Sequence, residues 1–195
     1  MRQQLGLGGA TSFLKIVAPH EVAHQWWGHI IGWKTYRDQW MSEGFADFSA
    51  TLFAHLVYKD DQFLNFWKDE RESLLKKNQY GKRPVDIGSV TMGYRIDSAK
   101  NEGIGRDMLY PKGAFILHML RMMMYDQRGG GDARFMAMMQ DFVKTHFNQN
   151  VSTEDFKAAV EKHMTPDMDL DGNHRMDWFF NEYVYGTEVP RYHVE

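Results

Sequence analysis

Apolar residues recur at helical spacing along nearly the whole chain. In the segment 61–77, for example, phenylalanine, tryptophan and leucine side chains form one stripe, and charged residues occupy most other positions, as expected of an amphipathic helix. The same pattern predicts helices over about 19–29, 41–58, 61–77 and 111–125, a further helix that contains 135–143, and another over about 174–184. No segment alternates convincingly between apolar and polar residues, so we predict a mainly α fold.

Local signals mark several helix boundaries. Pro19 suits the first position of a helix, where its missing N–H costs nothing. Ser152 and Asp155 have the spacing of a capping box, which would begin a helix at Ser152. The glycine-rich residues 6–9 do not complete a dinucleotide-binding pattern, and we interpret them as a flexible lead-in to the first helix.

The segment 78–109 is punctuated by glycine and proline and is longer than an ordinary loop. Such a segment is either functional or contains short strands that the pattern does not locate. The sequence shows no internal repeat, no low-complexity tract and no strong break in composition. We therefore predict a single domain over residues 1–195.

The overall composition excludes several classes of function. Lysine and arginine number 23 against 26 aspartate and glutamate, a formal charge of −3, so the chain lacks the basic surface that nucleic-acid binding requires. No apolar run reaches the roughly 18 residues of a membrane span. Cysteine is absent, which excludes disulfide scaffolds, cysteine nucleophiles and thiolate metal sites. The cellular compartment stays open.

The segment His20-Glu21-Val22-Ala23-His24 has the spacing of a zinc-binding helix. Residues four apart point from one face of a helix, so both imidazoles can reach one zinc ion at about 2.0–2.1 Å. Glu21 lies about 100° around the helix from His20, beside the metal, where a base that activates a metal-bound water would stand. The alternative is a buried helix with two histidines whose hydrogen bonds are satisfied.

A third candidate ligand follows at a fixed distance. Glu43 lies nineteen residues after His24, and a carboxylate on a neighbouring helix would complete a site of two histidines and one glutamate. Three protein ligands with one open position are typical of catalytic rather than structural zinc. The alternative is a solvated acid near a helix N-terminus, where the helix dipole favours it.

Further stretches make the pattern more specific. Residues 20–28 read HEVAHQWWG, residues 43–46 read EGFA, residues 110–114 read YPKGA, and residues 176–181 and 185–187 read MDWFFN and YGT. Together they resemble the M1 family of zinc aminopeptidases, members of the gluzincin group. The resemblance covers nearly the whole chain and implies the helical lobe of a thermolysin-like (gluzincin) zinc peptidase catalytic domain.

The resemblance also implies roles for individual residues. His20, His24 and Glu43 would bind zinc. Glu21 would act as general base and then as proton donor to the leaving amine, and Tyr110 would hydrogen-bond the oxyanion of the tetrahedral intermediate. From its residue type alone, Tyr110 would instead be a core ring with its hydroxyl at the surface.

Asp47 lies one helical turn after Glu43, on the same helix face. A carboxylate there can accept a hydrogen bond from a zinc-binding histidine and fix its tautomer. Simple solvation of Asp47 is an equal alternative.

The sequence also departs from the family pattern. The Gly-x-Met-Glu-Asn motif, through which the family recognises the free amino terminus of a substrate, is absent, and only nineteen residues precede His20. The strand-rich part that forms the other wall of the family's cleft has no counterpart either. We therefore expect this chain to be the α-helical part of a longer protein, with the remainder of that polypeptide as its partner.

We predict a zinc-dependent metallopeptidase that removes N-terminal amino acids from a peptide substrate, using a zinc-activated water with Glu21 as base. One alternative is a thermolysin-like endopeptidase, which shares the metal site and the base. Another is an isolated lobe that is inactive without its missing N-terminal part, because the substrate has nowhere to dock. Side-chain preference and oligomeric state stay open.

Overall fold

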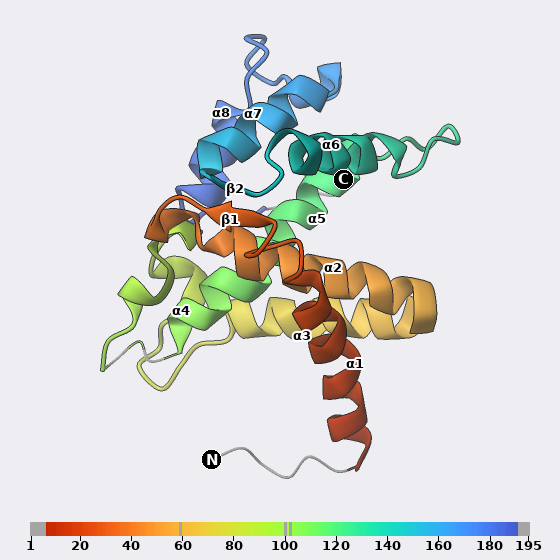
Figure 1. Cartoon of the computed structure of the whole chain (residues 1–195). Helices are drawn as coiled ribbons and strands as arrows, with labels where there is room; N and C mark the ends of the chain where they lie inside the picture. The colour runs from red at the N-terminus through yellow and green to blue at the C-terminus, as the bar shows by residue number, and fades with distance from the viewer. Residues whose placement is uncertain (1–6, 59, 100, 102, 191–195) are drawn as a thin grey trace, which may run out of the picture.

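The computed structural model describes residues 7–58, 60–99, 101 and 103–190, and it is mainly helical, which confirms the predicted fold class. Figure 1 shows the first helices in one half of the molecule, α6 to α8 in the other, and α5 running between them. The helices are α1 (Leu7–Ala23), α2 (Trp40–Tyr58), α3 (Asp60–Leu75), α4 (Ile104–Asp107), α5 (Gly113–Met124), α6 (Ala133–Thr145), α7 (Thr153–His163) and α8 (Asp177–Phe179). In the described part of the chain, no helix is long and apolar enough to cross a membrane.

Helix α2 is the centre of the core, because it packs against α1, α3 and α5 together. Its residues are buried around most of its circumference. The Phe45 ring lies 4.9 Å from the ring of Phe156 in α7, and the Phe142 ring in α6 lies 5.3 Å from the same Phe156. These aromatic contacts join the two halves of the molecule into one apolar core.

Helices α2 and α5 touch through their backbones. A Cβ atom on Gly44 would lie 2.6 Å from Gly113 Cα, and a Cβ atom on Gly113 would lie 2.7 Å from Gly44 Cα. Only glycine lets two helices approach this closely. The contact explains why the two sequence stretches EGFA and YPKGA each carry a glycine, and it brings the helix starts that hold Glu43 and Tyr110 side by side.

The start of α5 is anchored to the end of the chain. Lys112 is buried, and its Nζ donates a hydrogen bond to the Gly186 carbonyl at 2.9 Å. Burial lowers the pKa of Lys112 to about 8, against a smaller raising effect of Glu188. Before α5, the chain forms a π-helical turn, Met108–Lys112. Pro111 has no N–H to donate in this turn. The α-helix itself begins at Gly113, two residues after the predicted start at about residue 111.

Helix α1 differs most from the prediction. It begins at Leu7 and ends at Ala23, whereas we expected a helix over 19–29 after a flexible lead-in. Pro19 therefore lies inside the helix and not at its start. Gly28 adopts φ +102°, and a Cβ there would lie 2.6 Å from Ser42 Oγ, so the chain turns there and cannot continue as a helix. Of the expected lead-in, residue 6 lies outside the described residues.

The remaining boundaries follow local chemistry. Ser152 and Asp155 form both hydrogen bonds of a capping box at the start of α7, as predicted. The expected helix over 174–184 begins only at Asp177, because His174 has φ +56°, which is incompatible with a right-handed helix. From Phe180 to Val184 the chain continues as a second π-helical turn.

The hydrophobic pattern did not predict two short strands that the structure contains. Strand β1 (Ile31–Trp33) pairs in parallel with β2 (Gln149–Val151), and three residues are too few to show alternation. The segment 78–109 contains the 3₁₀ helices Pro84–Asp86 and Val90–Ile96, then α4. In the described part of this segment there is no strand, so that alternative is wrong.

We predict that the Gly44–Gly113 contact limits stability. Gly44→Ala and Gly113→Ala should each lower the free energy of unfolding by about 1–3 kcal/mol, the usual cost of overpacking. The double variant should lose less than the sum, because one separation of the helices accommodates both methyl groups. Urea unfolding in the presence of EDTA measures this. Gly81→Ala is the control, since it has φ +74° but open space around it, and its effect should add to that of Gly44→Ala.

Candidate metal centre

Two imidazoles face each other at the end of α1. The His24 N–H donates to the His20 carbonyl at 3.2 Å, so both residues remain in one helical turn although the regular helix ends at Ala23. Their Nε2 atoms lie 3.0 Å apart. The predicted arrangement of two histidines on one helix face is therefore present in the structure.

The other nitrogen of each ring has a defined partner. His20 Nδ1 lies 2.7 Å from Asp47 Oδ1, and His24 Nδ1 lies 2.8 Å from the Trp27 carbonyl oxygen. A carbonyl and an ionised carboxylate accept hydrogen bonds only, so each Nδ1 is the donor. In the neutral rings, both Nε2 atoms then carry a lone pair directed at the same point.

Glu43 brings a third acceptor to this point. Its Oε2 lies 3.4 Å from His20 Nε2 and 3.3 Å from His24 Nε2, yet it is buried and makes no hydrogen bond. Three converging acceptors with no hydrogen between them repel one another, and a cation relieves that repulsion. All three ligand atoms lie within 4.8 Å of one another, so two histidines and one glutamate fit the ligand set of a zinc ion with an open position.

The surrounding charges favour a cation as well. Burial opposes protonation of His20, but its hydrogen bond with Asp47 and the nearby Glu43 carboxylate outweigh it and raise the pKa of His20 to about 9. Burial works to raise the pKa of Glu43, and its contacts with His20 and Tyr110 reverse this and lower it. The two carboxylates stabilise positive charge at His20, whether it is a proton or a metal ion.

Glu21 and Tyr110 border the same cavity, which has a volume of about 850 Å³. The carboxylate of Glu21 is exposed on α1. The Tyr110 ring stacks on His20 with centroids 5.5 Å apart. Burial and the neighbouring Glu43 carboxylate raise the pKa of Tyr110 far above its usual value, so its hydroxyl keeps its proton and is a hydrogen-bond donor. π-helical turns such as the one that holds Tyr110 occur often at functional sites.

The structure thus brings all six predicted site residues to one cavity: His20, Glu21, His24, Glu43, Asp47 and Tyr110. It adds residues that the sequence analysis missed. Glu70 of α3 also lines the cavity, and burial, followed by Asp47 and Asp107, raises its pKa to about 8. A signal was available, because Glu70 stands at a position of the apolar stripe of the segment 61–77, three residues after Trp67.

Comparison with known proteins gives a consistent result. The peptidase family M1 domain matches residues 9–183. Aminopeptidase N of Haemonchus contortus is 30% identical over 154 residues, 77% of this chain and 14% of that protein. Glutamyl aminopeptidase of Bos taurus is 31% identical over 153 residues, 75% of this chain and 14% of that protein. The chain therefore spans about a seventh of the length of these relatives.

Solved structures agree with this. The M1 zinc metallopeptidase from Deinococcus radiodurans is similar with a TM-score of 0.59 and 26% identity, over 90% of this chain and 34% of that one. Leukotriene A4 hydrolase of Saccharomyces cerevisiae gives a TM-score of 0.65 at 20% identity, over 93% of this chain and 27% of that one, which is a likeness of fold alone. With the match to residues 9–183, these findings confirm the resemblance noted in the sequence, and the chain belongs to the peptidase family M1.

Proposed function

We propose that this chain is the metal-binding part of a zinc-dependent aminopeptidase. The observation that supports this most is the convergence of His20 Nε2, His24 Nε2 and Glu43 Oε2 on one point, where the buried Oε2 atom has no hydrogen-bond partner. These three residues would hold the zinc ion. When bound, zinc lowers the pKa of a coordinated water and polarises the peptide carbonyl.

Asp47 positions His20 in this proposal. It accepts the Nδ1 hydrogen of His20, which fixes the tautomer and makes Nε2 the nitrogen that faces the ligand position. A carboxylate behind a metal-binding histidine also increases the basicity of the ring. Ser42 supports the carbonyl that orients His24. Its hydroxyl donates a hydrogen bond of 3.3 Å to the Trp27 carbonyl oxygen, which also accepts the hydrogen of His24 Nδ1.

Glu21 is the group that moves protons. It lies next to His20 in the chain and borders the cavity, but it does not belong to the group of three ligands. Its carboxylate would take a proton from the attacking water and deliver it to the nitrogen of the leaving amine. Being exposed, it is reached easily by water and substrate.

Tyr110 is the hydrogen-bond donor of the site. Its hydroxyl stays protonated at neutral pH because burial and Glu43 raise its pKa. A donor aimed at the carbonyl oxygen of the scissile peptide stabilises the negative charge that develops there, and such donors contribute a large share of catalysis.

The exopeptidase assignment depends on the relatives, which are named aminopeptidases. The chain itself has no Gly-x-Met-Glu-Asn motif, so we assign recognition of the substrate's amino terminus to the remainder of a longer M1 polypeptide. One second candidate is an endopeptidase of the thermolysin type, which would use the same three ligands and the same base. Hydrolysis of N-acetylated peptides distinguishes the two, because an aminopeptidase needs the free amine.

The first prediction from this proposal concerns metal content. The purified chain should contain about one zinc ion per molecule by elemental analysis, as expected for a single ligand set. Glu43→Ala should lose the metal, because two histidines alone leave the site with too few ligands. Glu72→Ala is the matched control, since Glu72 is an exposed acid of α3. A wild-type chain that stays free of zinc after zinc is added would contradict the proposed ligand set.

The second prediction concerns Asp47. Asp47→Asn should weaken zinc binding by about 10–100-fold, the usual effect of removing such a carboxylate. Competition with a chelating dye measures the affinity. Asp69→Asn is the control, because Asp69 is an exposed carboxylate of the same cavity that does not contact either histidine. Equal zinc affinities of Asp47→Asn and wild type would refute the positioning role.

The third prediction separates chemistry from metal binding. Glu21→Gln and Tyr110→Phe should keep the zinc but lower kcat on an aminoacyl p-nitroanilide, by about 10²–10⁴-fold for the base and about 10²–10³-fold for the donor. Steady-state kinetics and elemental analysis on the same samples test this. If the zinc-loaded wild-type chain cleaves neither free nor N-acetylated peptides, the metal site stands and the catalytic assignment of the isolated chain fails.

A further inference from the structure

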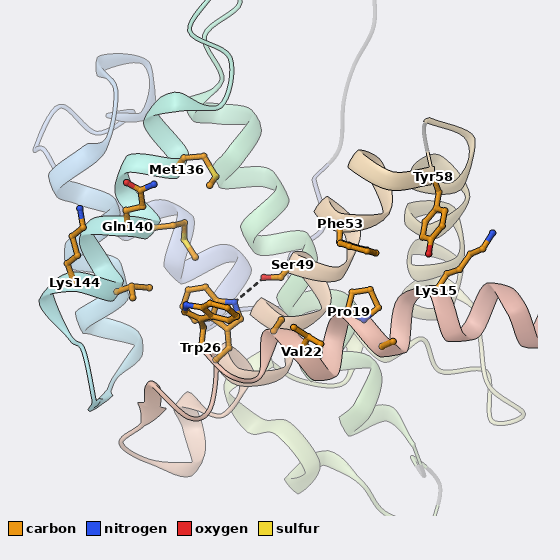
Figure 2. Close-up of a pocket in the computed structure, with 15 residues that line it drawn as sticks. Lys15, Pro19, Val22, Trp26, Ser49, Phe53, Tyr58, Met136, Gln140 and Lys144 are labelled. Carbon is orange, nitrogen blue, oxygen red and sulfur yellow. Dashed lines mark hydrogen bonds between the residues drawn. The ribbon is translucent and has the colours of Figure 1, made fainter.

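A second concave surface lies on the other side of α1 from the metal centre. Figure 2 shows this groove, which α1, α2 and α6 enclose, and its volume is about 730 Å³. It shares no lining residue with the metal cavity. Along α1, Pro19 and Val22 face the groove, whereas His20 and Glu21 face the cavity, as the 100° advance per residue requires.

The groove is apolar and open to solvent. Among its lining side chains, Val22 is 61% exposed, and Trp26, Phe53 and Met136 are each more than 40% exposed. These four residues come from three separate segments and gather around one hollow. A contiguous exposed apolar surface marks an interaction site far more often than a scatter of single apolar residues does.

The groove also has a charge pattern. Lys15 lies at one end and Lys144 at the other, with the apolar side chains between them (Figure 2). Among the side chains that the structure describes, no acidic one lines the groove. Lys15 Nζ lies over the Tyr58 ring, 4.6 Å from its centroid, and within the described residues neither lysine forms an ion pair. An occupant that complements this surface is apolar in the middle and negative at both ends.

The walls indicate the backbone conformation of that occupant. The walls are three helices and the turn at Trp26 and Trp27. The backbone groups of the helices are bonded internally, and those of Trp26 and Trp27 are bonded to Ala23, Ile31 and His24, so the walls offer no row of partners to an extended peptide. The Ser49 hydroxyl is already used, since it donates to the Phe45 carbonyl and accepts from Trp27 Nε1. A bound α-helix satisfies its own backbone hydrogen bonds and buries only side chains. The stretch of α1 from Lys15 to Ala23 is about 12 Å long at 1.5 Å per residue, which accommodates two to three helical turns.

We propose that this groove binds an amphipathic α-helix of a partner protein segment, with its apolar face on Trp26, Phe53 and Met136 and a carboxylate near each end opposite Lys15 and Lys144. The methionines of α6 suit such a surface, because their flexible side chains adapt to the occupant. This inference concerns a surface separate from the metal cavity and does not depend on peptidase activity.

The test uses two synthetic probes and the whole chain. Both are 14-residue helical peptides with leucines along one face of the central two to three turns. One has a glutamate on each side of this apolar stretch, and the other has lysines there. At low salt, the glutamate peptide should bind about tenfold more tightly, because two exposed attractions replace two repulsions and each contributes little. The difference should shrink at high salt. Fluorescence anisotropy of labelled peptides measures the affinities, and the emission of Trp26 and Trp27 reports contact with the groove.

Variants locate the binding surface. The double variant Lys15→Glu/Lys144→Glu should reverse the preference between the two peptides, and Phe53→Glu should weaken the glutamate peptide at least tenfold. Leu170→Glu is the matched control, because Leu170 is 67% exposed and lies outside the groove, and it should bind as the wild type does. Circular dichroism and zinc content of each variant verify that the fold and the metal site are intact.

Three outcomes would overturn the proposal. The first is equal affinity for the two peptides, unchanged by the double variant, which would indicate unspecific apolar adsorption. The second is dimerisation of the chain by sedimentation, abolished by Phe53→Glu, which would make the groove an interface between copies. The third is tighter binding of decanoate than of either peptide in competition, which would indicate a site for a small amphiphile.

Discussion

The backbone contact between Gly44 and Gly113 is the constraint on which the metal centre depends. It brings the first turn of α2 against the start of α5, so that Glu43 and Tyr110 become neighbours although 67 residues separate them in the sequence. One turn further along α2, Asp47 meets His20 of α1. Helix α2 therefore holds the site from the centre of the core, where close packing leaves little freedom for the side chains to move.

This packing imposes an electrostatic cost at the site. When both rings are neutral, two imidazole lone pairs and a buried carboxylate oxygen face one another, and they repel one another unless a proton or a metal ion lies between them. The rise in the pKa of His20 to about 9 expresses the same demand for positive charge. Local rules of satisfied polar groups are broken at functional sites more than elsewhere, and the apolar contacts of α2 with α1, α3 and α5 offset this cost. A zinc ion would need only to displace a proton from a site already shaped for it.

The sequence predicted what depends on regular spacing. Helices α2 and α3 begin and end within two residues of the predicted bounds. The sequence also singled out His20 and His24, because residues four apart share a helix face, and Glu43, because a carboxylate can complete their ligand set. The sequence did not predict the elements whose conformation depends on contacts between residues far apart in the chain. Strands β1 and β2 form by pairing with each other, and the chain turns at Gly28, beyond the end of α1 at Ala23, where it packs against Ser42. Glu70 stands on the apolar stripe of α3, but only the folded structure shows that Asp47 and Asp107 lie near it.

Residues 20–24 border two separate concave surfaces, the metal cavity and the apolar groove. The candidate site residues His20, Glu21 and His24 face the metal cavity, and Val22 and Ala23 between them face the groove. Ala23 is buried against the core and Val22 is the most exposed apolar side chain of the groove. The two inner positions of the zinc motif are thus not neutral spacers, because one is limited in size by the core and the other contributes to the apolar groove. Because α1 residues line both the metal cavity and the groove, a substitution on either side of the helix alters one of these two surfaces.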